Sequence, residues 1–152
     1  MGVLSAKLKL ESILIDPPET KKEPLFRHMV ETLAEPYQIK DVDQLFESVL
    51  EREEMISTCI GFGCAVPHCH TEQLEKTIFA AAKLDPPCDF DTPDDQPVSI
   101  VFLMAGPKKS TGTHIKLLSK LSRLLHDPEF RKQLQSSVDA EQFLDFLRMK
   151  DK

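Results

Sequence analysis

Most of the residues that could take part in chemistry lie in one stretch of the chain, from Arg52 to His70. It contains an arginine, a Gly61-x-Gly63 turn and the pair Pro67-His68. Glycine permits backbone conformations closed to other residues, whereas proline fixes its own φ and favours an extended residue before it. We therefore expect stiff backbone to hold His68. A near-neutral imidazole held in this way can be a nucleophile, an acid–base group or a metal ligand.

Two helices are expected to bring further polar groups to this stretch. Asp41 is typical of an N-cap, and the apolar spacing after it predicts a helix that ends near Glu51-Arg52 and carries Arg52 to the glycine turn. Farther along, Lys108 to Gly112 is predicted to be a loop. Thr113 is predicted to cap a second helix, which opens at His114 and continues with a stripe of leucines.

The remaining pattern alternates strands with helices. Helices are predicted over 24–34, 128–134 and 137–148, and a short helix or lead-in over 6–15. Strands are predicted within 56–60, over 98–104 and over 77–84, where three alanines leave a helix possible and Asp85-Pro86-Pro87 is expected to stop the element. This order predicts an α/β fold in which helices cover a sheet.

Length and composition limit the class of protein. A chain of 152 residues with 29% charged residues is expected to form a single soluble domain over 1–152. It lacks a signal-peptide pattern and an apolar run of about 20 residues, so a cytoplasmic location is expected. The net charge of −6 disfavours nucleic acid as a partner, and the four cysteines are expected to be reduced.

Several separated motifs occur together. They are Arg52-Glu53-Glu54, Ser57-Thr58, Gly61-x-Gly63-x-Ala65-Val66-Pro67-His68 and, much later, Thr113-His114-Ile115-x-Leu117-Leu118. From about Leu8 to Leu147 the chain resembles the fructose/mannitol-type (type 2) enzyme IIA of the bacterial phosphoenolpyruvate-dependent sugar phosphotransferase system, including its nitrogen-regulatory branch. The resemblance implies a single domain with a mixed central β-sheet and helices on both faces.

The resemblance also implies roles for three side chains. In the family, the histidine after the proline is phosphorylated, and the arginine and the later histidine line its site, which assigns these roles to His68, Arg52 and His114. The chemistry suits the residue types. A neutral imidazole can attack phosphorus, a planar guanidinium can hold phosphate oxygens, and an imidazole at a helix start can add a donor. The step needs no metal and no organic cofactor.

Two departures from the family pattern leave another reading open. The family usually has glycine where this chain has Cys59, and Gly-Arg or Gly-Lys where it has Cys69-His70, so His70 is a candidate substitute for the basic residue. The same changes gather Cys64, His68, Cys69 and His70 in one segment, and zinc binds Cys and His in tetrahedral sets. A zinc-binding module is therefore the alternative, although adjacent Cys69 and His70 do not match the usual ligand spacing.

The expected partners follow from the resemblance. They are a phosphorylated histidine-containing phosphocarrier protein as donor, and an enzyme IIB or a regulatory target as acceptor. The lack of a fused IIB or membrane domain favours the nitrogen-regulatory branch over sugar transport. Ile60, Phe62 and Val66 are candidates for an apolar docking centre. The basic edge formed by Lys116, Lys120 and Arg123 is expected to be solvated, with a docking rim as its alternative. His28 is expected to be structural.

Overall fold

The computed structural model of the chain describes residues 2–90 and 96–151. The buried strand β6 lies at the centre of its sheet. Strand β5 pairs with β6 antiparallel and with β1 parallel, and on the other side of β6 the strands β3 and β4 pair with it parallel. Strand β2 pairs antiparallel with β3. The sheet is mixed, as expected. Its strands are β1 Leu8–Ile15, β2 Cys59–Gly61, β3 Cys64–Ala65, β4 His68–His70, β5 Ile78–Cys88 and β6 Val98–Gly106.

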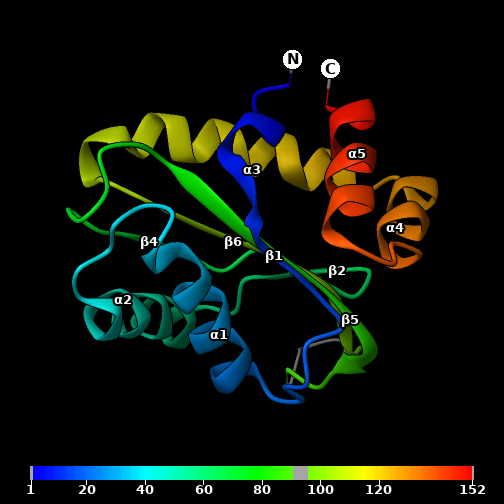
Figure 1. The fold of residues 1–152 in the computed structure, drawn as a ribbon, viewed down its shortest axis with the longest axis horizontal. Helices are drawn as coiled ribbons and strands as arrows, with labels where there is room; N and C mark the ends of the chain where they lie inside the picture. Colours follow the sequence, from blue (N-terminus) through cyan, green and yellow to red (C-terminus); the bar gives the residue numbers. More distant parts are fainter. Residues whose placement is uncertain (1, 91–95, 152) are drawn as a thin grey trace.

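Helices cover both faces of the sheet, which confirms the expected fold class (Figure 1). Helices α1 and α2 pack on one face, and α3, α4 and α5 pack on the other (Figure 1). Short 3-10 turns, η1 (Ser5–Lys7) and η2 (Lys108–Ser110), precede β1 and α3. The helices are α1 Lys22–Ala34, α2 Val42–Met55, α3 Thr111–Leu125, α4 Pro128–Gln135 and α5 Ala140–Lys150.

Successive side chains of β6 enter two different cores, because side chains alternate across a strand. The core against α1 and α2 receives Val101, Leu103 and Ala105. The core against α3, α4 and α5 receives Ile100, Phe102 and Met104. Because both faces of β6 are covered by apolar cores, residues 98–104 are apolar without alternation. The strand predicted there is confirmed. The alanines of β5 are also divided between the two cores, so their small size reflects close packing from both sides.

Three helix starts follow from capping aspartates. The side chains of Asp41, Asp127 and Asp139 accept hydrogen bonds from backbone N–H groups of the first turns of α2, α4 and α5. These bonds satisfy donors that have no partner inside the helix. The predicted helices at these positions are confirmed, although α2 continues to Met55, beyond the expected end at Arg52.

The prediction of a helix or lead-in over 6–15 was wrong for most of that segment. Residues Leu8–Ile15 form strand β1, which pairs with β5. The register shifts between Leu8 and Ile13, and Leu10 in between is exposed. A bulge of this kind interrupts the alternation of buried and exposed residues by which a strand is recognised.

Strand β5 is longer than predicted, because Asp85-Pro86-Pro87 does not end it. The strand continues to Cys88, which pairs with Val98 of β6. The register shifts between Lys83 and Cys88, and residues 85–87 are exposed. Prolines are tolerated where a bulge releases the backbone N–H from the ladder. The rest of the predicted turn falls partly outside the described residues.

The start of α3 also differs from the prediction. The helix begins at Thr111, with Ser110 as N-cap and η2 before it, so Thr113 does not cap it and Lys108 to Gly112 is not an open loop. The Thr111 hydroxyl donates to the Lys108 carbonyl oxygen at 2.6 Å, which ties η2 to the helix. His114 consequently lies inside the first turn of α3 and not at its opening.

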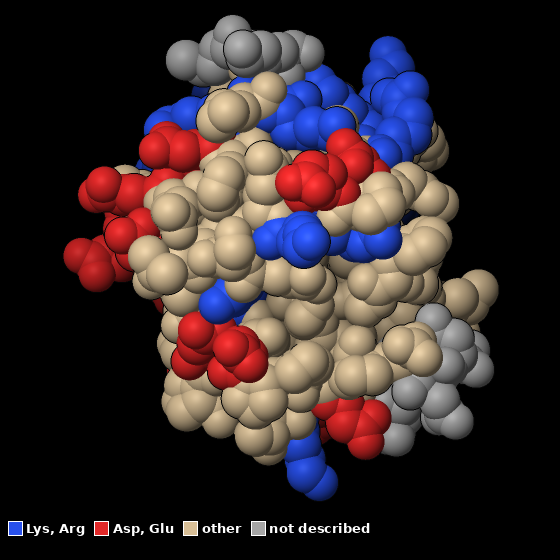
Figure 2. All heavy atoms as spheres, turned by 90° about the vertical axis from the view of Figure 1, so that its right-hand side faces the viewer, with Lys and Arg blue, Asp and Glu red and all other residues tan. Residues whose placement is uncertain are grey.

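Among the described residues, no helix is both long enough and apolar enough to span a bilayer. The face that carries α4 and α5 shows acidic and basic side chains interspersed over a largely uncharged surface (Figure 2). On α5, Arg148 forms an ion pair with Asp145 at 3.3 Å.

Phe102 should be a large contributor to stability, because its ring is buried at the centre of the sheet and contacts Phe79 and Phe143. Phe102→Ala is expected to lower the free energy of unfolding by about 3–5 kcal/mol. Met55→Ala, at a side chain that is 78% exposed, is the matched control and should change it by less than about 0.5 kcal/mol. Urea denaturation measures both, and equal losses would contradict this account of the core.

Candidate functional site

His68 is the first residue of β4, which pairs with β6. Residues 64–70 run parallel to β6 in one register, with Cys64 opposite Ile100, His68 opposite Met104 and His70 opposite Gly106. The Pro67 carbonyl oxygen bridges the gap between β3 and β4 by accepting the Met104 N–H at 2.9 Å. Because β4 and β6 are parallel, their carboxyl ends meet at one edge, where open α/β sheets usually bind ligands.

The His68 ring is oriented by its own backbone. Its Nδ1 atom lies 2.9 Å from the Val66 carbonyl oxygen. A carbonyl oxygen can only accept, so Nδ1 carries the hydrogen and the lone pair of the neutral ring is on Nε2. Burial lowers the pKa of His68, and the charges of Arg52 and His70 act in the same direction, against the Val66 hydrogen bond and Glu53. His68 is therefore a neutral imidazole at neutral pH, with its free lone pair on Nε2.

Arg52 lies in the last turn of α2, close enough for its charge to act on His68. Its Nη1 donates to the Ile56 carbonyl oxygen at 3.1 Å, which leaves other guanidinium N–H groups for an anion. The helix therefore brings Arg52 to the site as predicted from the sequence, and the arginine also closes the end of its own helix.

Glu53 is a site residue to which sequence reasoning gave no role. Its carboxylate is buried, accepts from the Thr58 hydroxyl at 2.6 Å and from the Thr58 N–H at 3.3 Å, and pairs with Lys22 at 3.1 Å. These bonds fix the end of α2 against the segment that leads into β2. In the sequence, Glu53 stands in the charged run Glu51 to Glu54, which is typical of a solvated helix end. Only the nearby Ser57-Thr58 motif offers a hydrogen-bonding partner for its carboxylate.

His114 is almost fully buried, with 3% of its surface exposed, and its ring nitrogens have no hydrogen-bond partner in the described residues. Burial, together with the charges of His70 and His68, lowers its pKa to about 4. A neutral imidazole has one N–H to donate. Space for the ring comes from Gly106, because a Cβ added there would lie 2.6 Å from His114 Nε2 and 2.7 Å from Thr77 Oγ1.

His70 completes a group of three imidazoles. Side chains two residues apart on a strand share a face, so His68 and His70 both point toward α3 while Cys69 between them enters the opposite core. The rings of His70 and His114 are stacked, with centroids 4.7 Å apart and planes 21° from parallel. The sequence-predicted residues Arg52, His68 and His114 are thus brought together, with His70 added.

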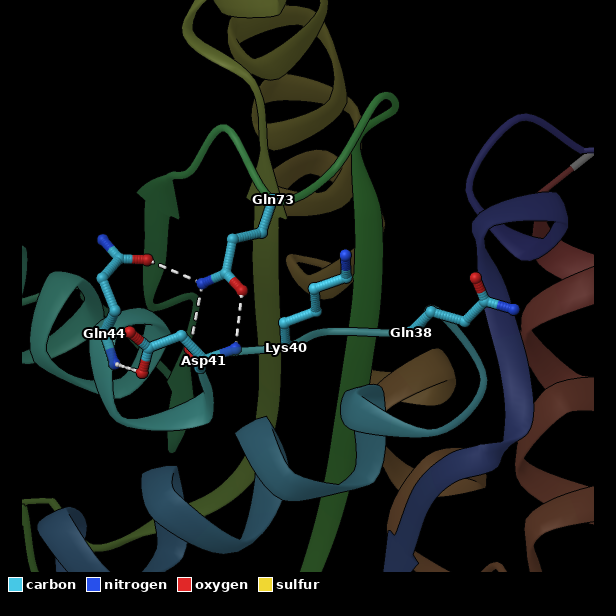
Figure 3. A pocket seen from close by; sticks show the side chains of 5 residues that line it. All are labelled: Gln38, Lys40, Asp41, Gln44 and Gln73. Atoms are coloured by element: carbon cyan, nitrogen blue, oxygen red, sulfur yellow. Dashed lines mark hydrogen bonds between the residues drawn. The ribbon is translucent and has the colours of Figure 1, made fainter.

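The loop after β4 is tied to the start of α2, the helix that carries Arg52. The Gln73 side chain accepts from the Asp41 N–H and donates to the Asp41 carbonyl, both at 2.9 Å, and also donates to Gln44 Oε1 at 2.8 Å (Figure 3). These residues line a shallow polar hollow of about 420 Å³ together with Gln38 and Lys40 (Figure 3). The hydrogen bonds among Asp41, Gln44 and Gln73 connect the loop after β4 to the first turn of α2.

The predicted apolar docking centre is only partly exposed. Val66 is buried and Ile60 is partly buried, whereas Phe62 is 50% exposed at the tip of the β2–β3 turn, between His126 and Arg131. Phe62 has φ of 59° and lies between two glycines that also have positive φ, so this turn is closely defined. Other exposed apolar side chains near Arg52 and His114 in the sequence are Met55, Ile56 and Ile115.

The basic edge of α3 is mixed in character. Lys116 and Arg123 are exposed, as expected for a solvated face, but Lys120 forms an ion pair with the buried Asp151 at 2.7 Å. Lys120 therefore stabilises the end of the chain. His28 is half-exposed and lies 2.8 Å from Glu19, in agreement with the structural role expected for it.

The geometry does not fit the zinc alternative. Cys64 packs into the core under α3, α4 and α5, whereas Cys69 packs into the core on the other face of the sheet. Burial raises the pKa of each thiol to about 12, although zinc binds the thiolate. Within 2–90 and 96–151, no three His, Cys, Asp or Glu side chains are grouped so as to hold a metal ion.

Residues 7–150 match the family model described as "Phosphoenolpyruvate-dependent sugar phosphotransferase system, EIIA 2". The chain belongs to this family. EIIA components carry phosphohistidine, so the chain is a phosphocarrier of the phosphotransferase system. The match confirms the resemblance drawn from the motifs around His68 and His114.

Relatives of this EIIA chain include nitrogen regulatory proteins. The chain is 41% identical to that of Bradyrhizobium diazoefficiens over 97 residues, which is 64% of this chain and 63% of the relative. It is 31% identical to that of Pseudomonas aeruginosa over 140 residues, 88% of this chain and 91% of the relative. The crystal structure of the nitrogen regulatory protein IIA-Ntr from Neisseria meningitidis superposes with a TM-score of 0.88 at 29% identity, covering 95% and 99% of the two chains.

Gly106→Ala tests the packing that admits His114. The new Cβ would lie 2.6 Å from His114 Nε2 and 2.8 Å from Thr77 Cα, so we expect a loss of about 1–3 kcal/mol in unfolding free energy and a displaced His114 ring. Gly112→Ala is the control, because nothing lies within 4 Å of a Cβ there and alanine favours the helix. Urea denaturation and the His114 NMR resonances report the result; an undisturbed ring would contradict the account.

The low pKa of His114 predicts a pH dependence of stability. Between its unfolded pKa near 6.5 and its folded pKa of about 4, the unfolded chain binds more protons, so stability present above pH 6.5 is lost as pH falls through this window. The unfolding free energy of the wild type should fall relative to His114→Gln by up to about 1.4 kcal/mol per pH unit. A difference that stays constant from pH 7 to pH 4 would refute this.

Proposed function

We propose that His68 Nε2 accepts the phosphoryl group. The observation that carries this proposal is the 2.9 Å hydrogen bond from His68 Nδ1 to the Val66 carbonyl, because it leaves the lone pair of the neutral ring on Nε2. The lowered pKa of His68 keeps that lone pair free of a proton at neutral pH. Both conditions are needed for an imidazole to attack phosphorus.

The reaction is a direct exchange between two imidazoles. The Nε2 lone pair of His68 forms a bond to the phosphorus of a phosphohistidine on the donor protein. The phosphorus–nitrogen bond of the donor breaks, and its electron pair returns to the donor ring. His68 keeps the Nδ1 hydrogen throughout, shared with Val66, so the charge that develops on its ring is stabilised by the carbonyl oxygen.

Arg52 and His114 would stabilise the transferred group from two helices. The Arg52 guanidinium at the end of α2 supplies N–H donors and a positive charge for the phosphoryl oxygens. Neutral His114 supplies one N–H, and its place in the first turn of α3 adds the positive end of a helix dipole. Because both groups are held by packed helices, little reorganisation is needed when negative charge arrives.

The donor that fits this chemistry is a phosphorylated histidine-containing phosphocarrier protein. We place its contact at the exposed apolar side chains Met55, Ile56 and Ile115, which adjoin Arg52 and His114 in the chain. Exposed apolar residues beside a reacting group suit a transient interface between two proteins. The phosphorylated chain would pass the group to an enzyme IIB or signal to a regulatory target.

The nitrogen-regulatory role is favoured because the relatives described above are named nitrogen regulatory proteins and the superposed structure is a IIA-Ntr. The family description names a sugar phosphotransferase system, which keeps a role in sugar transport as a second candidate. The two roles differ in the acceptor, so transfer from the phosphorylated chain to an enzyme IIB of the fructose/mannitol type would favour transport.

The first test is phosphorylation by phosphoenolpyruvate, enzyme I and the donor phosphocarrier, followed by intact-mass analysis at neutral pH. We expect a gain of one acid-labile phosphate in the wild type and none in His68→Gln. Arg52→Lys and His114→Gln should still be phosphorylated, but with initial rates reduced roughly 10²-fold, as for loss of one positioned donor. A slower transfer in these two variants would show that Arg52 and His114 act on the phosphoryl group and do not merely support the fold.

His28→Gln is the matched control, since His28 is a half-exposed histidine on α1 paired with Glu19. It should be phosphorylated at the wild-type rate. Phosphate on His68→Gln would exclude His68 as the acceptor, and unchanged rates for Arg52→Lys and His114→Gln would exclude them from the site.

A further inference from the structure

His70 has a position that the proposed transfer step does not yet use. It is exposed at the end of β4, on the same face as His68, and its ring lies on the ring of buried His114. The charge of His70 acts on the ionisation of both other imidazoles. A phosphoryl group on His68 would therefore come within the field of His70.

Thr111 and His114 both lie against the His70 ring. The Thr111 hydroxyl donates to the Lys108 carbonyl at 2.6 Å, so toward His70 it can only accept. The His70 Nε2 atom lies 3.5 Å from Thr111 Oγ1, a distance too long to fix the tautomer of the ring. A protonated His70 ring would rest on the face of neutral His114.

The other charged groups around this cluster are carboxylates and a guanidinium. Helix α2 contributes Arg52 and Glu53, which act on His68. The segment after β4 contributes Glu72, whose carboxylate accepts the backbone N–H of Lys108, the η2 residue beside it. Carboxylate, ammonium and guanidinium groups do not ordinarily titrate between pH 6 and 8.5, whereas imidazole does. Of the three imidazoles, His68 is the acceptor and His114 is enclosed.

We propose that His70 supplies a proton-dependent positive charge for the phosphoryl group on His68, so that the phosphorylated state of this chain is stabilised as the pH falls. The inference rests on His68 being the acceptor. A phosphoryl group carries roughly two negative charges, and these favour the protonated form of a nearby imidazole. By linkage, protonation of His70 then favours phosphorylation to the same degree.

The test is a competition in one tube. Wild type and His70→Gln are mixed at equal concentration with a limiting amount of phosphorylated donor phosphocarrier, and the phosphorylated fraction of each is measured at equilibrium by intact mass. Because both chains share one donor pool, the titration of the donor cancels from their ratio. The ratio of phosphorylation equilibrium constants, wild type over His70→Gln, should rise roughly three- to tenfold from pH 8.5 to pH 6.

Two controls separate charge from structure. His70→Lys carries a fixed charge, so its ratio against His70→Gln should exceed one and should not rise as the pH falls. His28→Gln against wild type should stay at one. A wild-type ratio that does not change with pH would overturn the proposal, and a constant offset would show a merely structural role for His70. Absence of phosphate from every chain at every pH would instead contradict the proposed transfer from the donor phosphocarrier to His68.

Discussion

The structure depends most on the parallel pairing of residues 64–70 with β6. This edge has only five ladder residues, in β3 and β4, because Val66-Pro67 interrupts it, yet it fixes the position of His68 relative to everything else at the site. The same pairing places His70 opposite Gly106, and Gly106 is where the backbone leaves room for His114. Two histidines from one strand and one from a helix far along the chain therefore meet through a single ladder.

Helices then add charge to an edge that has little of its own. Helix α2 ends with Arg52, held by the Ile56 carbonyl, and with Glu53, held by Thr58 and Lys22. Helix α3 contributes a neutral imidazole from its first turn. The two helices lie on opposite faces of the sheet, so the site is assembled where both layers reach the same edge (Figure 1). This explains why His114 joins the site from a segment far from Arg52 and His68 in the sequence.

Sequence reasoning found His68 and Arg52 because local chemistry marks them. Pro67 before His68 and a capped helix before Arg52 are visible in short windows. The burial of His114 is not, since it depends on Gly106 and Thr77, which reach it only in the folded sheet. Glu53 was overlooked for a similar reason, because a charged run gives no sign that one carboxylate turns inward to Thr58. Strand β1 was missed because its bulge breaks the alternation that identifies strands.

The alternation within β4 has one more consequence. Cys69 faces the core under α1 and α2, while its two neighbours face the opposite side. If the strand slid by one residue along β6, both imidazoles would enter an apolar core and the thiol would reach the edge where phosphoryl chemistry is proposed. Such a slip would conserve much of the pairing but bury two polar rings, so the correct alignment is selected by polarity. The small, apolar Cys69 thus helps to fix the register in which the histidines on either side face the site.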